Sequence, residues 1–439
     1  MWDLLMKYLC PRDFRRGEME ARMKKNLKKM LKKTKLGKIV FRNIQMRNRK
    51  KMVLSCVREM KVNDKQIIFS SFQGRLYSCS PKAIYEYMIS NPQFDDYKFI
   101  WAFNKPEQKQ SLFTDGRTVL VKYNSKDFFK YLASSKYWIF NFKTPEYFVK
   151  KENQIFLQCW HGTPLKRIGM DIEVDGNAAT DKKKIHESYL NDAKKYDYFI
   201  SPSRYATERF VSSFGLKLLD KENIIIEQGY PRNDKLKNFD ADDIIEIKRK
   251  LNISSDKKVI LYCPTFRDDQ YKPGVGHTYQ LGINLLRLKE KLGDGYFLLL
   301  RLHYLVSNKI DISQFKGFAL DVSSYDDIND LYLISDVLVT DYSSVFFDFA
   351  NLNRPMIFYM YDRELYQGTL RDFYLDLKDI PGPIIEDECK LIEALRNIDE
   401  IACKYQEKIK QFSSVYNYLD DGHATERTIK ELMNNENNK

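Results

Sequence analysis

Residues 335–359 read SDVLVTDYSSVFFDFANLNRPMIFY, and the order of residue types in this stretch indicates the fold of the chain. Val337–Thr340 is a short apolar run of the kind that forms a buried strand. A polar turn follows, then a predicted helix at Ser343–Asn351 and a second apolar strand at Met356–Tyr359. Strand, helix and strand in this order predict a βαβ unit, whose two strands lie parallel in one sheet.

The same alternation continues along the chain on both sides of this stretch. In the second half, strands are predicted at Lys258–Cys263, Tyr296–Leu302 and Ala319–Val322, with helices at Gly282–Lys291 and Asp327–Leu333. In the first half, strands are predicted at Gln66–Phe72, Tyr97–Phe103, Thr118–Tyr123, Tyr137–Asn141, Gln154–Trp160, Tyr198–Ser201 and Asn223–Gln228, with helices at Ser80–Ser90 and Ser203–Phe214. This pattern predicts an α/β protein whose parallel sheets are covered by helices.

The charged stretch Lys235–Asp243 lies between the two halves and is predicted to be a linker. We therefore expect two Rossmann-like domains, at 61–234 and 235–415, that face a cleft. An arm at 1–60 precedes them, and a helical segment at 416–439 is expected to pack back across them. Ligands of such sheets bind beyond the carboxyl ends of the strands, so residues just after strands are the candidates for a site.

The positive charge of the chain is concentrated at its N-terminus. The net charge is +13 over 439 residues, and residues 1–51 hold 18 Lys and Arg against four acids, a net of +14 that leaves −1 for the rest. A neutral body argues against a nucleic-acid enzyme with a basic cleft. Residues 18–36 place apolar and basic side chains at helical spacing, which predicts an amphipathic helix on an anionic membrane surface. The side chains expected at that surface are Met19, Met23, Lys24, Lys25, Leu27, Lys28, Lys29, Met30, Leu31, Lys32 and Lys33.

Two other interpretations of the arm stay open, a solvated helix packed on the body through its Met stripe and a tail that binds RNA. No aromatic residues interleave the basic ones in residues 18–36, so nucleic acid is not expected as a partner. No apolar stretch approaches the ~20 residues of a membrane span. The seven Cys are scattered without a CxxC pair, which argues against a disulfide framework or a zinc site and favours the reducing cytoplasm.

Two histidines follow directly on strong predicted strands. His161 stands in WHGTPLK (160–166), where a glycine and a helix started by Pro164 would leave its imidazole facing the cleft. A lone histidine is more often structural than catalytic, and in this context both roles stay open. His303 ends LRLH, and Arg301 points to the same side of the strand, which would bring two cations together.

Three further turns after strands carry polar residues. TDYSS (340–344) would form a phosphate site at a helix start, or an ordinary N-cap through Asp341 or Ser343. PTFRD (264–268) and GYPRND (229–234) each place an arginine in a turn, as a surface residue or an anion ligand. P-loop, dinucleotide-binding, zincin and nucleophile-elbow motifs are missing from the sequence. Two histidines, several arginines and a phosphate site are typical of phosphoryl or nucleotide-sugar transfer.

Taken in order, these motifs resemble the CDP-glycerol glycerophosphotransferase family of teichoic acid synthesis. The matching segments are WHGTPLKRIG (160–169) with Asp171, SPSRYATERF (201–210), GYPRND, PTFRD, RLHY (301–304), residues 335–359 and DDGHATER (420–427). The resemblance covers roughly residues 67–432 and implies a GT-B fold, in which two Rossmann-like domains face a cleft. It also implies a peripheral membrane enzyme that moves a polyol phosphate from a CDP-polyol to a hydroxyl of a lipid-linked acceptor and releases CMP.

Carried over residue by residue, the resemblance makes His161 the candidate base for the acceptor hydroxyl and His303 the catalytic partner at the donor pyrophosphate. Asp348 would reach the ribose, and Phe266 stands where tryptophan is more common, which would soften a stacking contact. The implied donor- or phosphate-binding side chains are Arg301, Thr265, Arg267, Asp341, Ser343, Ser344, Asp348 and Arg232. The implied acceptor-side residues are Gly162, Thr163, Lys166 and Asp171.

The resemblance implies no prosthetic group, and no acidic cluster in the sequence marks a metal site. The donor would be CDP-glycerol or CDP-ribitol, and the acceptor a lipid-linked saccharide or polyol phosphate. Primase and polymerase both remain open, as do teichoic acid and capsule products. Two other classes are a GT-B glycosyltransferase that uses a nucleotide sugar and a peripheral membrane scaffold. The scaffold would leave the two strand-end histidines and the TDYSS turn without a purpose.

Overall fold

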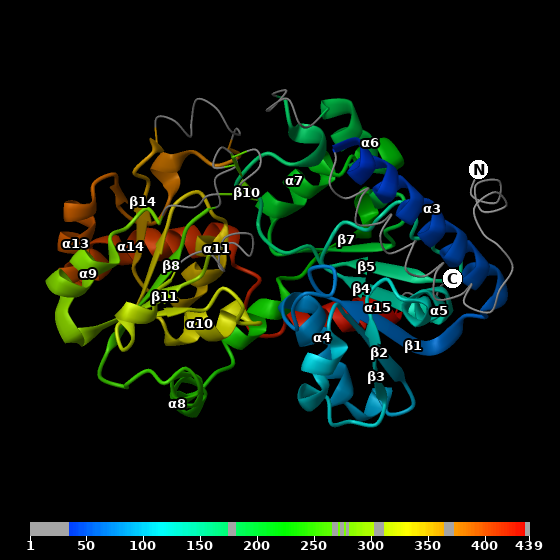
Figure 1. Ribbon diagram of the computed structural model, residues 1–439, viewed down its shortest axis with the longest axis horizontal. Coiled ribbons are helices and arrows are strands. Elements are labelled where there is room, and N and C mark those ends of the chain that lie inside the picture. Colours follow the sequence, from blue (N-terminus) through cyan, green and yellow to red (C-terminus); the bar gives the residue numbers. More distant parts are fainter. Residues whose placement is uncertain are drawn as a thin grey trace, which may run out of the picture.

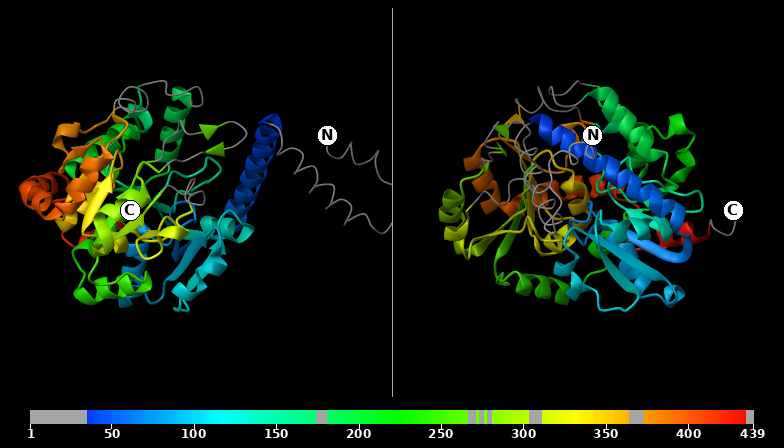
Figure 2. Two further views of the ribbon diagram at one scale, coloured as in Figure 1. Left: turned by 60° about the vertical axis from the view of Figure 1, so that its left-hand side comes forward. Right: turned by 45° about the vertical axis from the view of Figure 1, so that its right-hand side comes forward.

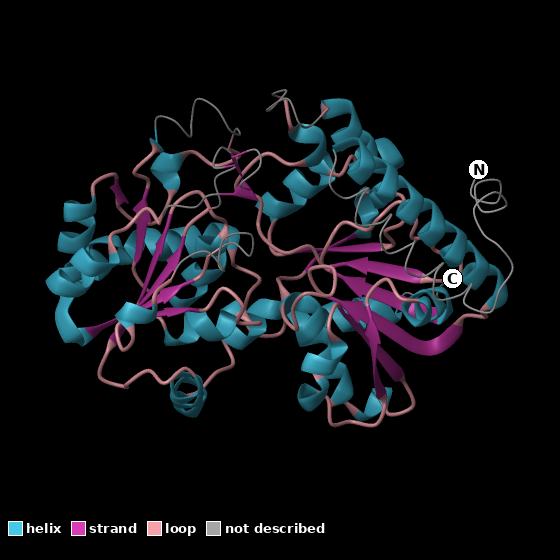
Figure 3. Ribbon diagram, viewed as in Figure 1, coloured by secondary structure: helices cyan, strands magenta, loops and turns pink. Residues whose placement is uncertain are grey.

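The computed structural model describes residues 35–173, 181–265, 271–272, 276–277, 281–302, 311–363 and 373–434. The chain forms two α/β domains, each built on a parallel sheet that lies between layers of helices (Figures 1 and 3). The α/β fold expected from the sequence is confirmed. The predicted membrane-surface residues between Met19 and Lys33 lie outside the described residues.

The N-terminal domain contains a seven-stranded sheet with the order β3-β2-β1-β4-β5-β6-β7. Its strands are β1 (Asn63–Ser70), β2 (Lys98–Phe103), β3 (Thr118–Lys122), β4 (Ser135–Phe140), β5 (Ile155–Gln158), β6 (Tyr198–Ser201) and β7 (Ile225–Glu227). All neighbouring pairs are parallel. Residues 66–70 of β1 are buried in succession, because helices cover both faces of a central parallel strand.

Helices cover the two faces of this sheet. The first face carries α3 (Lys35–Glu59), α5 (Lys126–Ser134), α6 (Lys182–Ala193) and α7 (Arg204–Ser213), and the second carries α4 (Cys79–Ile89). Figures 1 and 2 show α3 at the periphery of the domain, on the side away from the C-terminal domain. Its inner side packs on α5 and contributes Val53 and Cys56 to the core, so this part of the expected arm lies against the domain.

The C-terminal domain repeats the design with a six-stranded sheet of order β12-β11-β8-β13-β14-β15. Its strands are β8 (Lys258–Cys263), β11 (Tyr296–Leu300), β12 (Ala319–Asp321), β13 (Val337–Thr340), β14 (Met356–Tyr359) and β15 (Ile384–Ile385). β9 (Tyr271–Lys272) and β10 (Gly276–His277) form a separate antiparallel pair. β13 and β14 are parallel neighbours with Val339 opposite Ile357, as the βαβ prediction requires.

Helices also cover both faces of the second sheet. The first face carries α8 (Ala241–Lys250), α10 (Ile328–Ile334), α11 (Val345–Phe349) and α14 (Ile398–Tyr416), and the second carries α9 (Leu285–Leu292) and α13 (Glu388–Arg396). The predicted helix at Ser343–Asn351 is split into α11 and a 3-10 turn at Ala350–Leu352.

The connection between the domains is more ordered than the sequence suggests. A 3-10 helix, η7, spans Pro231–Leu236, and α8 begins at Ala241 behind a capping box of Asp240 and Asp243. The linker predicted at Lys235–Asp243 is therefore wrong in extent. Its charged residues cap the start of α8 and cover the exposed side of that helix. Such residues have the same composition as a linker, which explains the prediction.

After α14 the chain returns to the N-terminal domain. There α15 (Ala424–Asn434) packs on α4 and η7, and its Ile429 and Leu432 are buried in the N-terminal core. Asp234 of η7 accepts hydrogen bonds from the first N–H groups of this segment, at 2.9 Å from Ala424 and 2.7 Å from Thr425. The last described helix thus joins the two domains at the base of the cleft.

Candidate active site

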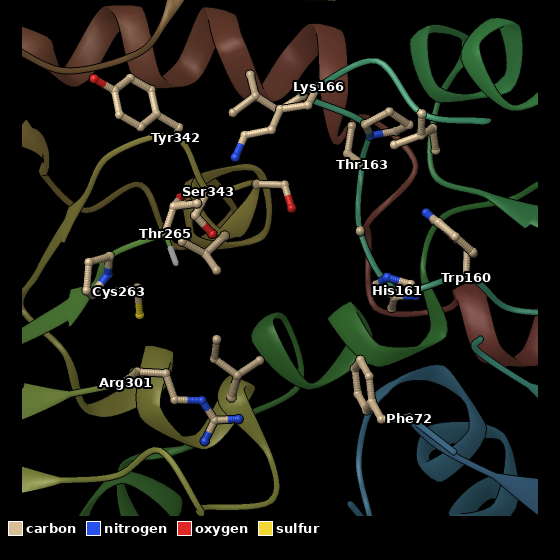
Figure 4. Close-up of a pocket in the computed structure, with 18 of the residues that line it drawn as sticks. Phe72, Trp160, His161, Thr163, Lys166, Cys263, Thr265, Arg301, Tyr342 and Ser343 are labelled. Atoms are coloured by element: carbon tan, nitrogen blue, oxygen red, sulfur yellow. The ribbon is translucent and has the colours of Figure 1, made fainter. Parts of the chain in front are cut away.

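A cleft of about 630 Å³ lies between the domains and is lined by loops that follow strand ends. Phe72 follows β1 and Trp160 and His161 follow β5, and these form the N-terminal wall. Thr265 follows β8 and Ser343 follows β13, and these face them from the C-terminal wall (Figure 4). Residues from both halves of the chain therefore meet at one site, as expected for ligands that bind beyond strand ends.

His161 presents its imidazole to the cleft, where the residue is exposed. Its Nδ1 lies 2.7 Å from the carbonyl oxygen of Asn141, so we assign the proton to Nδ1 and leave Nε2 as an acceptor. The rings of Trp160 and Phe72 flank it, with centroids 4.2 Å and 5.7 Å away. This desolvation, together with the charge of Arg232, lowers the pKa of His161 to about 4, so the imidazole is neutral at neutral pH.

The residue before the histidine has an unusual backbone. Trp160 adopts φ 45°, in the left-handed region that non-glycine residues rarely occupy. Its N–H donates to the Gln158 Oε1 at 3.0 Å, which helps to hold this conformation. Such strain is typical of functional loops, where the surrounding structure fixes one conformation.

The expected helix after His161 is not formed. Pro164 was to start it, but residues 163–168 are non-helical and Lys166 makes a β-bridge with Phe373 of the C-terminal domain. The helix prediction is wrong because this segment finds backbone partners across the cleft instead of within itself.

The TDYSS turn forms the opposite wall. Asp341 is buried, and its Oδ1 accepts hydrogen bonds from the N–H groups of Thr265 at 2.8 Å and Tyr342 at 2.6 Å. This carboxylate therefore ties the loops after β8 and β13 together. The N-cap of α11 is Ser344, whose side chain makes no capping bond, so neither Asp341 nor Ser343 has the N-cap role considered above. Ser343 and Ser344 line the cleft.

Arg301 lies at the floor of the cleft, just beyond β11 (Figure 4). Its Nη1 donates to the carbonyl oxygens of Val322, at 2.8 Å, and of Tyr325. Burial lowers its pKa, but a guanidinium keeps its proton at any physiological pH. Within the described ranges it forms no ion pair, and it lines the cleft. Its expected neighbours His303 and Arg267 lie outside the described residues, as does Phe266.

Two residues expected at the donor instead pair with each other. Arg232 and Asp348 form a buried ion pair, 2.9 Å from Nη2 to Oδ1, beneath the cleft. They line a smaller cavity of about 210 Å³ that shares His161 and Arg301 with the main cleft.

The acceptor-side residues separate into two groups. Gly162, Thr163 and Lys166 line the cleft, and Gly162 lies close to Ser344. Asp171 does not line it. This carboxylate accepts hydrogen bonds from the hydroxyls of Ser212 and Tyr374, which join the two domains beside the cleft.

The sequence reasoning missed the loop after β1. Phe72 lines the main cleft, and Ser78 and Cys79, at the start of α4, line the smaller cavity. The rule applied to other strands would have pointed to this loop, because Gln73 and Gly74 directly follow the predicted strand, whose last residue is Phe72, and SP (80–81) starts a helix.

Two kinds of feature are absent from the described part of the chain. It contains no group of three His, Cys, Asp or Glu side chains placed to hold a metal ion. None of its helices is both long and apolar enough to cross a bilayer.

Comparisons with known proteins agree with these observations. A teichoic acid poly(glycerol phosphate) polymerase of Staphylococcus epidermidis is 43% identical over 372 residues, 84% of this chain and 50% of that protein. A teichoic acid glycerol-phosphate transferase of Staphylococcus aureus is 42% identical over 374 residues, 84% of this chain and 93% of that protein. The chain spans about half the length of the polymerases of S. epidermidis and Bacillus subtilis.

The fold and the sequence profile point to the same group. A solved structure of the wall teichoic acid polymerase TagF, a variant soaked with CDPG, matches with a TM-score of 0.81 at 41% identity. The match covers 90% of this chain and 95% of that one, so the GT-B fold is confirmed. Residues 52–434 match the profile of the CDP-glycerol:poly(glycerophosphate) glycerophosphotransferases. The chain therefore belongs to the CDP-glycerol:poly(glycerophosphate) glycerophosphotransferase family.

Proposed function

We propose that this protein transfers glycerol phosphate, or another polyol phosphate, from a CDP-polyol to a hydroxyl of a lipid-linked acceptor and releases CMP. The observation that carries the proposal is the placement of a neutral histidine, His161, opposite the hydroxyls of Ser343 and Ser344 in one cleft. The glycerol-phosphate transferases and polymerases among its relatives support this reaction, and the TagF variant soaked with CDPG supports a CDP-activated donor.

The side chains supply what a phosphoryl transfer needs. The acceptor oxygen forms a bond to the phosphorus that carries the glycerol, and the bond from that phosphorus to the CMP oxygen breaks. The Nε2 of His161 accepts the proton of the attacking hydroxyl. Ser343 and Ser344 donate to phosphate oxygens, and the charge of Arg301 offsets the negative charge that develops. Thr265 lies beside them, and His303 and Arg267 are proposed to complete the donor side.

A lipid-linked acceptor would place the reaction at the cytoplasmic face of the membrane, with the protein bound peripherally. The net charge of +14 in residues 1–51 supports this location, because an anionic surface attracts such a segment. The described helix α3 adds apolar side chains, since Val40, Ile44 and Leu54 are exposed beside the exposed Arg47 and Lys51. Basic side chains on such a helix are attracted to an anionic lipid surface.

Nucleotide release tests the proposed function. The full chain is incubated with a lipid-linked acceptor and, in separate reactions, with CDP-glycerol, CDP-ribitol, a UDP-sugar or a GDP-sugar. We expect CMP only from a CDP-polyol, together with an acceptor lengthened by a polyol phosphate. Release of UDP or GDP would instead identify a glycosyltransferase. If no nucleotide is released from any donor, the result would favour the peripheral membrane scaffold.

Replacement of His161 tests the proposed base. We expect His161→Ala to lower kcat by about 10²–10⁴-fold, the usual contribution of a positioned base, while CDP binds as before in calorimetry. His186→Ala is the matched control, because His186 lies on α6 and does not line the cleft. Turnover of His161→Ala near that of this control would contradict the assignment.

A further inference from the structure

A buried ion pair joins the segment between the domains to the helix that follows the TDYSS turn. The Nε of Arg232 lies 3.2 Å from the Oδ2 of Asp348, and its Nη2 lies 2.9 Å from the Oδ1. Their side chains are 4% and 11% exposed. Asn233 adds a third bond, from its Nδ2 to the same Oδ1 at 3.1 Å. Asp348 lies one helical turn beyond Ser344, so the pair fixes the position of the helix start that lines the cleft.

The third nitrogen of the same guanidinium reaches toward the histidine loop. The Nη1 of Arg232 donates to the Sγ of Cys79 at 3.7 Å, and the thiol of Cys79 faces the carbonyl oxygen of Trp160 at 3.9 Å. Cys79 and Trp160 have φ values of 65° and 45°, so both hold the left-handed conformation that only surrounding contacts stabilise. A continuous chain of contacts thus runs from Asp348 through Arg232 and Cys79 to the residue before His161.

These contacts leave the guanidinium with protein partners on each of its nitrogens. Its face is also occupied, because its Cζ lies 3.8 Å from the ring centre of Tyr230. Asp348 likewise has both oxygens engaged, by Arg232 and Asn233. Two side chains that already satisfy each other's hydrogen bonds have little hydrogen-bonding capacity left for a substrate. A buried ion pair is also a weak source of stability, and a role in fixing one geometry is the better-attested reason for keeping one.

We propose that Arg232 and Asp348 are positioning residues that set the place of Ser344 relative to His161. This role replaces the donor contacts that the resemblance implies for them. This inference rests on the proposed function of the cleft. Because the two walls of the cleft belong to different domains, their spacing depends on contacts that cross between them. A displacement of about 1 Å at reacting groups costs on the order of 10²-fold in rate, so a pair beneath the cleft can control turnover without touching substrate.

Single substitutions separate positioning from donor binding. We expect Arg232→Lys and Asp348→Asn each to lower kcat by about 10²-fold, because lysine cannot form the bidentate fork and asparagine cannot accept it. The Kd for CDP, measured by calorimetry, is expected to stay within about twofold of the wild-type value. A rise of the Kd by tenfold or more would overturn the inference in favour of a donor contact, and unchanged kcat and Kd would also overturn it.

Loss of one partner from a buried pair can unfold a protein, so a second variant is needed. The double variant Arg232→Met with Asp348→Leu removes both charges, and apolar replacements of buried pairs are often tolerated. We expect it to fold, as judged by cooperative unfolding, and still to lose turnover. Lys150→Gln is the matched control, because Lys150 pairs with Asp197 at 2.7 Å and neither residue lines either cavity. Its kcat is expected to remain at the wild-type level.

The histidine itself provides a readout that does not depend on turnover. Its imidazole NMR signals, assigned by comparison with His161→Gln, are expected to shift in the double variant. The ring packs against Trp160, whose carbonyl oxygen is contacted by Cys79, the residue that Arg232 holds. If wild-type protein releases no CMP, the proposed function fails while these signals still report on positioning. Unchanged signals would overturn the positioning role.

Discussion

Gly162 and Ser344 lie close to each other across the cleft, although they belong to different domains. A Cβ atom at Gly162 would come within 3.1 Å of the Ser344 Oγ. This is closer than such atoms usually approach, so a larger residue must push the two walls apart or turn the serine. Glycine after the histidine therefore lets the loop that carries the proposed base reach the proposed phosphate ligand.

The close approach predicts the effect of added volume at this position. We expect Gly162→Ala to lower kcat/KM about tenfold and Gly162→Val about 10²-fold, because the displacement grows with the side chain. Steady-state CMP release measures both. Gly116→Ala is the control, since nothing lies within 4 Å of a Cβ placed there. Full activity of the valine variant would mean that the two loops are free to separate.

The pKa of His161 predicts the acid limb of the pH profile. A base must be neutral to accept a proton, so kcat should fall only as the pH drops through the pKa of His161, which is about 4 rather than the ordinary 6.5. We expect kcat to be nearly constant from neutral pH down to about pH 5. Stopped assays at constant ionic strength, with fluorescence at each pH to verify folding, provide the measurement. A loss of activity centred near pH 6.5 would contradict the lowered pKa.

Asp420 predicts a pH-dependent component of stability. It is buried and accepts hydrogen bonds from the Tyr230 N–H at 2.9 Å, the Asn233 Nδ2 at 2.6 Å and the Asn351 Nδ2 at 3.0 Å. Burial raises its pKa to about 6 despite these bonds, which oppose the rise. The folded chain therefore binds this proton more tightly than the unfolded chain, so stability is lost as the pH rises from about 4 through about 6.

We expect Asp420→Asn to lack that component. The difference in free energy of unfolding between the wild type and this variant should fall by on the order of 1–3 kcal/mol between about pH 4 and pH 7, as urea titrations would measure. Asp421→Asn is the neighbouring control. Arg427 lowers the pKa of Asp421, so its contribution is present above the ordinary carboxyl pKa and is lost only at more acidic pH. A flat difference for Asp420→Asn would contradict the raised pKa.

The exposed side of α3 predicts binding to anionic vesicles. Replacement of Arg47 and Lys51 by glutamate should weaken binding at least about tenfold, because each basic residue near an anionic surface contributes about 1 kcal/mol. Flotation with phosphatidylglycerol vesicles measures the change in binding. Flotation with zwitterionic vesicles measures the part of the binding that does not depend on charge. Lys404→Glu with Lys410→Glu is the matched control, on the exposed side of α14 in the other domain. Equal losses in both pairs would show a general charge effect rather than a surface on α3.

The accuracy of the sequence predictions follows the depth of burial. The bounds of β6, β8, β13 and β14 agree with the predicted strands, because strands covered on both faces are apolar without interruption. The 19-residue helix α14 was not predicted, and only Ile398, Ile409 and Phe412 of it are buried. A helix that buries few side chains carries a weak periodic signal.

The sequence by itself indicated the α/β architecture and, through the resemblance of its motifs, the family. Parallel strands carry the residues that follow them to one edge of their sheet, which placed His161 at the edge of the first sheet and Ser343 and Ser344 at the edge of the second. Only the tertiary structure decided which polar groups satisfy one another. Arg232 and Asp348 are 116 positions apart, and Asp171 and Tyr374 are 203 positions apart. Hydrogen-bond partners at such separations are selected by the packing of whole domains, and that packing leaves no mark in the spacing of residues along the chain.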